Sequence, residues 1–238
     1  MMAKSKIKGK PKKSEDLIEN PEALADQISK TEEFLEKNKQ MVMIVGGAIA
    51  LIVAGYFLYS YWVTNQNENA QNEMFQAVYY FEADSLDLAL NGDGNNYGFL
   101  QIIDNYGMSK AANLAHYYVG AIYLKKGQFI SAIDQLEKFS SDDLLIQARA
   151  YALIGDAYME MGNIEEAANY YMRAAKYKPN EYTSPLYLMK AAVAYETLED
   201  YESALDCYDT IVSKYVESNE YQNARKHKAR LEGKIKTS

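Results

Sequence analysis

Residues 41–63, MVMIVGGAIALIVAGYFLYSYWV, form 23 consecutive positions without a charged side chain. A helix of this length is about 34 Å long, enough to cross a hydrocarbon core of about 30 Å. A cleavable signal peptide has a shorter apolar core followed by small residues, whereas this run continues well past Ala48 and Ala50. We therefore expect one uncleaved transmembrane helix over 41–63. A cleaved leader and a buried core helix are the alternatives.

Lysine placement predicts the orientation of this helix. Residues 1–40 contain nine Lys, six of them among the first 13 residues, and neither Lys nor Arg occurs between Val63 and Lys110. Positively charged flanks stay in the cytoplasm, so we expect a cytoplasmic N-terminus and an exported C-terminal part. Tyr56, Tyr59, Tyr61 and Trp62 would form an aromatic belt at the outer interface.

The charge balance and the rare residue types exclude several functions. The net charge of -8 divides into +1 for residues 1–40 and -9 for the rest, which makes nucleic-acid binding unfavourable. Two His and one Cys offer no metal-ligand spacing, and Cys207, within a helical pattern, is expected in the core. No phosphate loop or catalytic motif is present. We expect no catalytic residue, metal, cofactor or small-molecule substrate.

The stretch NGDGNNYGFLQIID, residues 91–104, has two interpretations. Asp93, Asn95, Gly98 and Asp104 occupy ligand or turn positions of a calcium loop, but Tyr97 stands where an oxygen ligand belongs. Glycine, Asn and Asp are also the usual residues of a loop between two helices. A connecting loop is the better interpretation.

Small and aromatic residues recur at fixed distances in the remainder of the chain. Gly120, Gly155 and Ala192 lie 35 and 37 residues apart, and each is followed three residues later by a tyrosine and twelve residues later by an alanine. Four residues further on come Leu136, Tyr171 and Tyr208. Such periods indicate repeated helical hairpins, in which the small residue lets helix A approach helix B. Gly127 and Gly162 are expected where helix A ends.

This pattern resembles the tetratricopeptide repeat, most closely over Ala148–Asn180. The resemblance implies an all-α fold: one N-terminal transmembrane helix, then a tetratricopeptide-type α-solenoid of helical hairpins with a C-terminal capping helix. The expected organisation is a cytoplasmic head (1–40) with a short amphipathic helix (about 20–38), a transmembrane helix (41–63), a degenerate helical pair (64–112), three repeats (113–218), and a basic capping helix and tail (219–238).

The whole arrangement, with the stretch YGMSKAANLA at 106–115, resembles the ancillary subunit of the bacterial Sec translocon. The resemblance implies a single-pass protein of the bacterial inner membrane with a periplasmic C-terminal domain. Its implied partners are Sec translocon subunits and an anchored periplasmic prolyl-isomerase-like chaperone. The expected function is a non-enzymatic scaffold that holds the chaperone or emerging client chains near the channel exit. The alternative is an adaptor in another envelope machine, for outer-membrane assembly or cell-wall coordination, with the helix as a simple tether.

In such arrays, helix A of each repeat lines a groove at its second, fifth, ninth and twelfth positions. The predicted protein-binding residues are Leu114, Tyr117, Leu124, Arg149, Asp156, Met159, Met189 and Glu196. The Lys and Asn that would clamp a terminal carboxylate are missing from these positions. We expect a mostly apolar groove, with adaptable methionines and with Arg149 and Asp156 to orient the ligand. The alternative is that some of these residues face neighbouring helices.

A second predicted contact surface lies in the apolar helix. Gly46, Ala50 and Ala54 recur every four residues and form one stripe of small side chains. Small residues at this spacing let another helix come close within a bilayer. We expect the stripe to pack against a partner helix, although Gly and Ala are common enough in membrane spans for the spacing to arise by chance.

Overall fold

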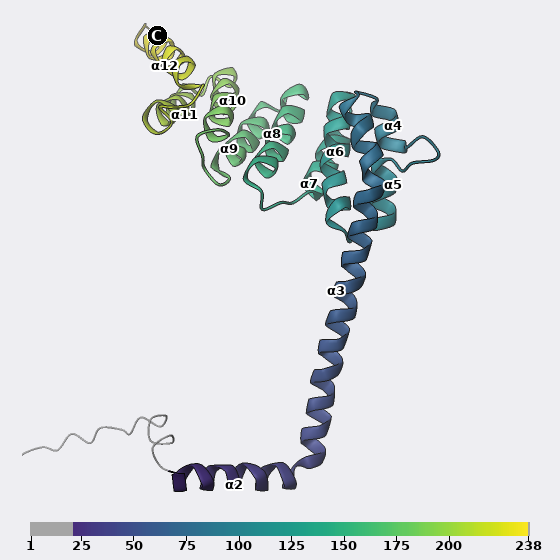
Figure 1. Cartoon of the computed structure of the whole chain (residues 1–238). Coiled ribbons are helices and arrows are strands. Elements are labelled where there is room, and N and C mark those ends of the chain that lie inside the picture. Colours follow the sequence, from purple (N-terminus) through teal and green to yellow (C-terminus); the bar gives the residue numbers. More distant parts are fainter. Residues whose placement is uncertain (1–20, 238) are drawn as a thin grey trace, which may run out of the picture. The chain divides into compact units, whose positions relative to one another are not determined.

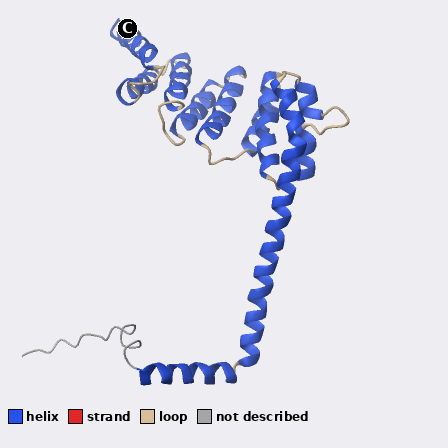
Figure 2. Ribbon diagram, viewed as in Figure 1, coloured by secondary structure: helices blue, strands red, loops and turns tan. Residues whose placement is uncertain are grey.

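The computed structural model describes residues 21–237 and is built from helices and loops (Figure 2). The eleven helices are α2 (Pro21–Lys37), α3 (Lys39–Glu82), α4 (Leu86–Asn91), α5 (Phe99–Tyr106), α6 (Lys110–Lys125), α7 (Phe129–Lys138), α8 (Leu144–Glu160), α9 (Ile164–Lys176), α10 (Ser184–Thr197), α11 (Tyr201–Lys214) and α12 (Tyr221–Thr237). The all-α prediction is confirmed. The predicted cytoplasmic head falls partly on residues 1–20, which lie outside the described residues.

The first compact unit, Met1–Tyr61, contains α2 and the apolar part of α3. Helix α3 is 44 residues long, and its most apolar 18-residue window has a mean hydropathy of 2.4. None of this window is buried, and Leu51, for example, is 76 % exposed. By length and composition α3 is therefore able to cross a membrane. The apolar run at 41–63 does not form a helix of its own, because the helix continues without interruption to Glu82.

The second unit, Trp62–Ser238, consists of helical hairpins that follow one another along the chain (Figure 1). Helices α6 and α7, α8 and α9, and α10 and α11 form three pairs, each joined by a turn of three residues. Such short turns make the two helices of a pair antiparallel. The three pairs are the hairpins that the repeated spacing predicts.

Each A helix ends with the same backbone geometry. Gly127 and Gly162 have φ angles of 72° and 77°, and their N–H groups donate to the carbonyls of Leu124 and Met159. Left-handed residues of this kind close α-helices by satisfying their last carbonyls. In the third hairpin the same position is held by Glu199, with φ 60° and a hydrogen bond from its N–H to the carbonyl of Glu196. In the third hairpin, Glu199 therefore stands in place of the glycine, and the turn keeps its left-handed residue and its hydrogen bond.

The small residues of the repeat are needed where the two helices of a hairpin touch. A Cβ atom placed on Gly155 would lie 2.7 Å from Cε1 of Tyr171 and 3.2 Å from the carbonyl oxygen of Ala167. At Gly120, the corresponding Cβ would lie 2.5 Å from Cγ of Leu136. All three distances are shorter than ordinary van der Waals contact, so a side chain at either position would force its neighbours to shift.

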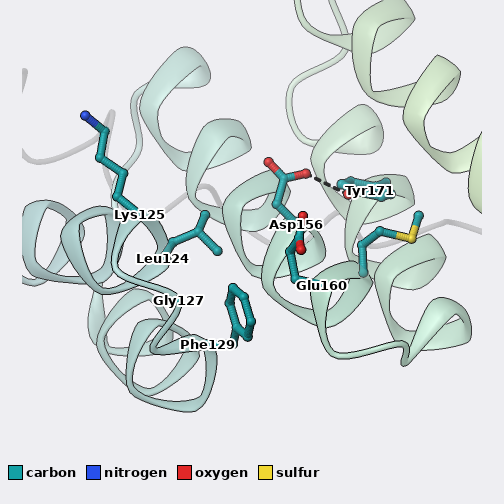
Figure 3. A pocket seen from close by; sticks show the side chains of 8 residues that line it. Leu124, Lys125, Gly127, Phe129, Asp156, Glu160 and Tyr171 are labelled. Carbon is teal, nitrogen blue, oxygen red and sulfur yellow. Dashed lines mark hydrogen bonds between the residues drawn. The ribbon is translucent and has the colours of Figure 1, made fainter.

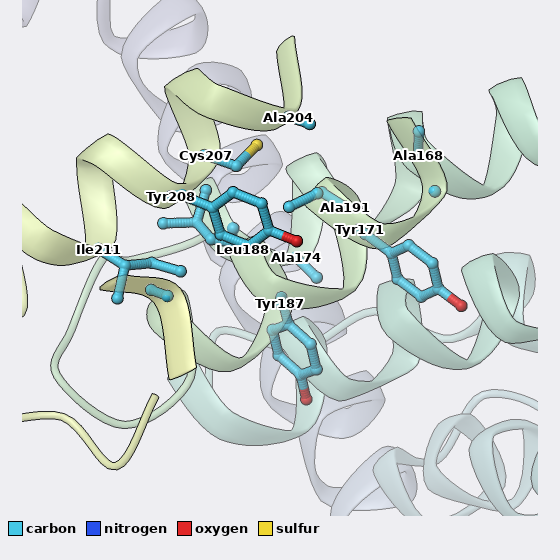
Figure 4. Close-up of a cluster of buried hydrophobic side chains, with 14 of the residues drawn as sticks. Ala168, Tyr171, Ala174, Tyr187, Leu188, Ala191, Ala204, Cys207, Tyr208 and Ile211 are labelled. Atoms are coloured by element: carbon cyan, nitrogen blue, oxygen red, sulfur yellow. The ribbon is translucent and has the colours of Figure 1, made fainter. Parts of the chain in front are cut away.

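Three clusters of buried side chains run along the second unit. The first joins α3, α4, α5 and α6, the second joins α6, α7 and α8, and the third extends from α8 to α12. Figure 4 shows the third, in which Tyr171, Tyr187 and Tyr208 lie among alanines and Leu188. Ala224 and Leu231 of α12 are buried in the same cluster. Helix α12 thus covers the last apolar face, as expected for a capping helix.

Residues 64–112, where we expected a degenerate helical pair, contain the end of α3 followed by the two short helices α4 and α5. The helix from the apolar run ends at Glu82, Asp84 takes a left-handed conformation with φ 56°, and α4 begins at Leu86. Aspartate tolerates this conformation better than most residues. The loop between α4 and α5 is held by Asp93, whose carboxylate accepts hydrogen bonds from the Tyr80 hydroxyl, the Asn95 and Asn96 backbone N–H groups and the Asn96 side chain.

Candidate protein-binding surface

One pocket lies between the first and second hairpins and has a volume of about 440 Å³. Its lining residues are Leu124, Lys125, Gly127, Phe129, Asp156, Met159, Glu160 and Tyr171. Figure 3 shows Leu124 and Phe129 on one side and Asp156 and Glu160 on the other, with Lys125 extending away. Three of the eight predicted groove residues, Leu124, Asp156 and Met159, therefore meet in one place.

Asp156 is already bound within the protein. Its carboxylate accepts a hydrogen bond from the Tyr171 hydroxyl at 2.6 Å and forms an ion pair with Lys190 at 2.7 Å. Burial and the hydrogen bond to Asp156 raise the pKa of Tyr171 well above its ordinary value. The hydrogen bond joins α8 to α9, and the ion pair joins α8 to α10 and offsets the charge of Asp156. From the sequence we expected Asp156 and Arg149 to act together as orienting charges. In the structure the cation paired with Asp156 is Lys190.

Arg149 is exposed on α8 and stands beside two buried phenols. Tyr117 and Tyr187 are 8 % and 6 % exposed. Burial raises the pKa of both tyrosines, and the charge of Arg149 opposes that rise. The charge of Arg149 on α8 thus acts on a tyrosine of α6 and on a tyrosine of α10. Tyr117 itself packs on Phe139, with the ring centroids 5.4 Å apart.

Glu196 is the second acidic residue of the predicted groove, and it too is engaged. Its carboxylate accepts a hydrogen bond from the Tyr208 hydroxyl at 2.7 Å and forms an ion pair with Arg230. The Nδ1 atom of His227 lies 3.9 Å away. The contacts of Glu196 thus connect α10 to α11 and to the capping helix.

The remaining predicted residues are divided between surface and core. Leu114 lines a larger pocket of about 750 Å³ with Phe139 and Ile146. Met189 is half-buried against the third cluster. Arg149 is exposed. Leu186, which stands at the second helix-A position of the third repeat but is not one of the eight, is 41 % exposed. The structure therefore brings some of the eight residues together in pockets, while others support the helices.

Sequence reasoning missed Lys190 and Tyr187. Both lie on α10, Lys190 directly after Met189 and Tyr187 two residues before it, but outside the four helix positions from which the groove was predicted. Lys190 reaches Asp156 only because its side chain is long enough to span to the preceding A helix. The available sequence signal is that Lys190 of one A helix follows Asp156 of the previous A helix by 34 residues, about one repeat.

The small-residue stripe is exposed along α3. Gly46, Ala50 and Ala54 are all exposed, and a Cβ on Gly46 would meet nothing within 4 Å. The stripe stays a predicted packing face.

Groups that could hold a metal or act as a nucleophile are scarce. Among the described residues, no cluster of three or more His, Cys, Asp or Glu side chains could hold a metal ion. The Cys207 thiol is 2 % exposed, and burial raises its pKa to about 12. A thiol with so high a pKa is a poor nucleophile near neutral pH.

A model of the tetratricopeptide repeat matches residues 148–181. The chain contains a tetratricopeptide repeat. The match covers α8, α9 and the turn that leads to α10, and so includes Arg149, Asp156, Met159 and Tyr171. No curated protein matches the chain.

The repeat indicates the general role of the second unit. Stacked helical repeats present extended surfaces to other proteins, and tetratricopeptide repeats are typically scaffolds without catalytic groups. The repeat at 148–181 therefore suggests a scaffold for protein–protein interaction.

Proposed function

We propose that the protein is a membrane-anchored scaffold associated with the Sec export channel. Helix α3 would be its anchor, with the N-terminus in the cytoplasm and the repeats in the periplasm. The repeats would hold an anchored prolyl-isomerase-like chaperone, or emerging client chains, near the channel exit. The observation that carries the scaffold role is the pocket in which side chains of two successive hairpins, Leu124 and Met159, meet beside Asp156.

Two features support the proposed location. Helix α3 has the length and composition of a membrane span, and nine lysines precede position 41 while neither Lys nor Arg occurs at 64–109. That asymmetry favours a cytoplasmic N-terminus. The choice of the Sec channel rests on the resemblance to its ancillary subunit.

Two pairs of substitutions separate membrane contact from groove contact. Ala50→Ile with Ala54→Ile keeps α3 apolar but blocks close approach of another helix, so recovery of membrane partners should fall. Arg149→Glu with Leu186→Asp changes two exposed side chains of the repeats, so the periplasmic partner should be lost and the membrane partner kept. The measurement is identification of the proteins that co-purify with the full chain in mild detergent.

Ile130→Asp is the matched control for the groove pair, because Ile130 is 74 % exposed on helix α7, outside the predicted groove. It should leave both kinds of partner unchanged. If Sec subunits do not co-purify with the unaltered protein, an adaptor in another envelope machine becomes the better account. If neither pair changes what co-purifies, both predicted surfaces are wrong.

A further inference from the structure

The two ends of the helical array have very different outer surfaces. Solenoids need a polar outer face on their terminal elements to stay soluble, and α12 provides one at the C-terminal end. At the other end, Phe75 and Tyr79 of α3 are 75 % and 59 % exposed. The first helix of the array is therefore not capped in the way that the last one is.

The exposed aromatic side chains belong to a continuous face of α3. Residues three and four apart lie on the same side of a helix. We define the aromatic face of α3 as Glu68, Asn72, Phe75, Tyr79 and Glu82, all of which are exposed. The opposite side carries Ala70, Met74 and Ala77, which are buried against α4, α5 and α6. The aromatic face thus points away from the array.

This face is acidic as well as aromatic. No Lys or Arg occurs at 64–109. Asp84 and Asp87 are paired with Lys125 and Lys126 of α6. For Glu68 and Glu82, the described part of the chain contains no cation within ion-pair distance. A partner that supplies positive charge would complement the aromatic face.

Helix α12 carries a face of complementary shape. Its outer face, directed away from the buried Ala224 and Leu231, consists of Gln222, Lys226, Ala229, Gly233 and Lys236, all exposed. A Cβ atom on Gly233 would meet nothing within 4 Å. Small residues four apart leave room for two large rings with the same spacing. Ala229 and Gly233 therefore match Tyr79 and Phe75.

The charges of this outer face also fit. Lys228 and Arg230 are engaged within the chain by Asp209 and Glu196. Lys226 has no acidic partner within ion-pair distance among residues 21–237. In an antiparallel pairing that sets Tyr79 against Ala229, helical spacing puts Glu82 opposite Lys226. Successive helices of the array run antiparallel, so this direction continues the stack.

We propose that the array associates head to tail: the aromatic face of α3 in one copy binds the outer face of α12 in a second copy. The aromatic rings lie over Ala229 and Gly233, and Glu82 pairs with Lys226. Such contacts between unlike surfaces are heterologous and allow more than two copies to join. A second copy covers the exposed aromatic pair and supplies a cation to Glu82.

Site-directed crosslinking of the full chain in membranes tests this directly. Chains with Tyr79→Cys and chains with Ala229→Cys, carrying different tags, are expressed together and treated with a short bis-maleimide. We expect a crosslinked product that contains both tags. Tyr79→Cys alone and Ala229→Cys alone should each give little product. Tyr182→Cys combined with Ala229→Cys is the control for random collision, because Tyr182 is 82 % exposed.

Charge reversal provides the second measurement. Lys226→Glu should lower the yield of the mixed product several-fold by placing like charges together, and Glu82→Lys in the partner chain should restore it. Equal yields from the mixed chains and from the Tyr182→Cys control would overturn the proposal. It would also be overturned if Tyr79→Cys crosslinked mainly to itself or to a different protein, or if charge reversal had no effect.

Discussion

At the scale of single residues, the hairpins depend on positions where no side chain fits. Gly155 faces the Tyr171 ring, whose hydroxyl is held by Asp156 and whose face is fixed among buried neighbours. The ring itself is 3 % exposed. Interiors are packed so densely that even one added methyl group is felt.

We expect Gly155→Leu to destabilise the second unit by about 1–3 kcal/mol, the usual cost of overpacking. Gly233→Ala is the matched control, because it also adds a side chain to a helical glycine but meets open space. That change should stabilise by about 0.5–1 kcal/mol, since alanine is the better helix former. Urea unfolding followed by circular dichroism measures both. Equal midpoints for Gly155→Leu and the unaltered protein would contradict the packing described.

Cys207 gives a prediction about pH. Burial raises its pKa from 9.0 to about 12, so the thiol stays protonated in the folded protein at pH 8. We expect it to react with iodoacetamide only after unfolding in urea, whereas Tyr182→Cys should react at once in the folded protein. Because the folded-state pKa is the higher one, the corresponding stability is present below pH 9 and is lost as the pH rises toward 12. Rapid labelling of Cys207 in the folded protein would contradict its burial.

At the scale of helices and turns, each A helix ends at a residue in the left-handed conformation, but the type of that residue differs between hairpins. Gly162 and Glu199 have φ angles of 77° and 60° at equivalent positions. A left-handed residue with a Cβ costs roughly 1–2 kcal/mol relative to its ordinary conformation. Glycine pays no such penalty.

Exchange of these two residue types should therefore change stability in opposite directions. Glu199→Gly should raise the free energy of unfolding by up to about 1 kcal/mol, while Gly162→Glu should lower it by about 1–2 kcal/mol. Thermal unfolding of the full chain in detergent measures both changes. A loss of stability in Glu199→Gly would mean that the Glu199 side chain contributes more than its backbone conformation costs.

Turns and close helix contacts were predictable because they depend on residue types at short, fixed spacings, such as Gly120 with Gly127. Contacts between hairpins were harder. The ion pair of Lys190 with Asp156 joins residues that are 34 positions apart through a long, flexible side chain. No spacing of residues within a single hairpin predicts this contact. The break at Asp84 was missed for a related reason: an aspartate tolerates the left-handed conformation without the glycine that signals it.

At the scale of the whole molecule, the proposed topology places residues before and after α3 on opposite sides of the membrane. A cysteine introduced at the exposed Tyr182 should react with an impermeant thiol reagent in cells with a permeabilised outer membrane, because the repeats would lie outside the cytoplasm. A cysteine at Ser5 should react only after the inner membrane is opened. Mass shifts on a gel measure both. The reverse labelling pattern would exclude the proposed export of the repeats.

The separate clusters of buried side chains have a mechanical consequence. Each hairpin contacts mainly the hairpins before and after it, so the array is held together only by the interfaces between successive hairpins. If a partner held by the repeats is pulled while α3 is anchored, the tension passes through the intervening helix interfaces in series. The cluster with the fewest buried residues joins α6 and α7 to α8 around Tyr117 and Ile154, so we expect this interface to open first under load. The scaffold would then behave as an extensible tether whose weakest interface lies beside the proposed binding pocket.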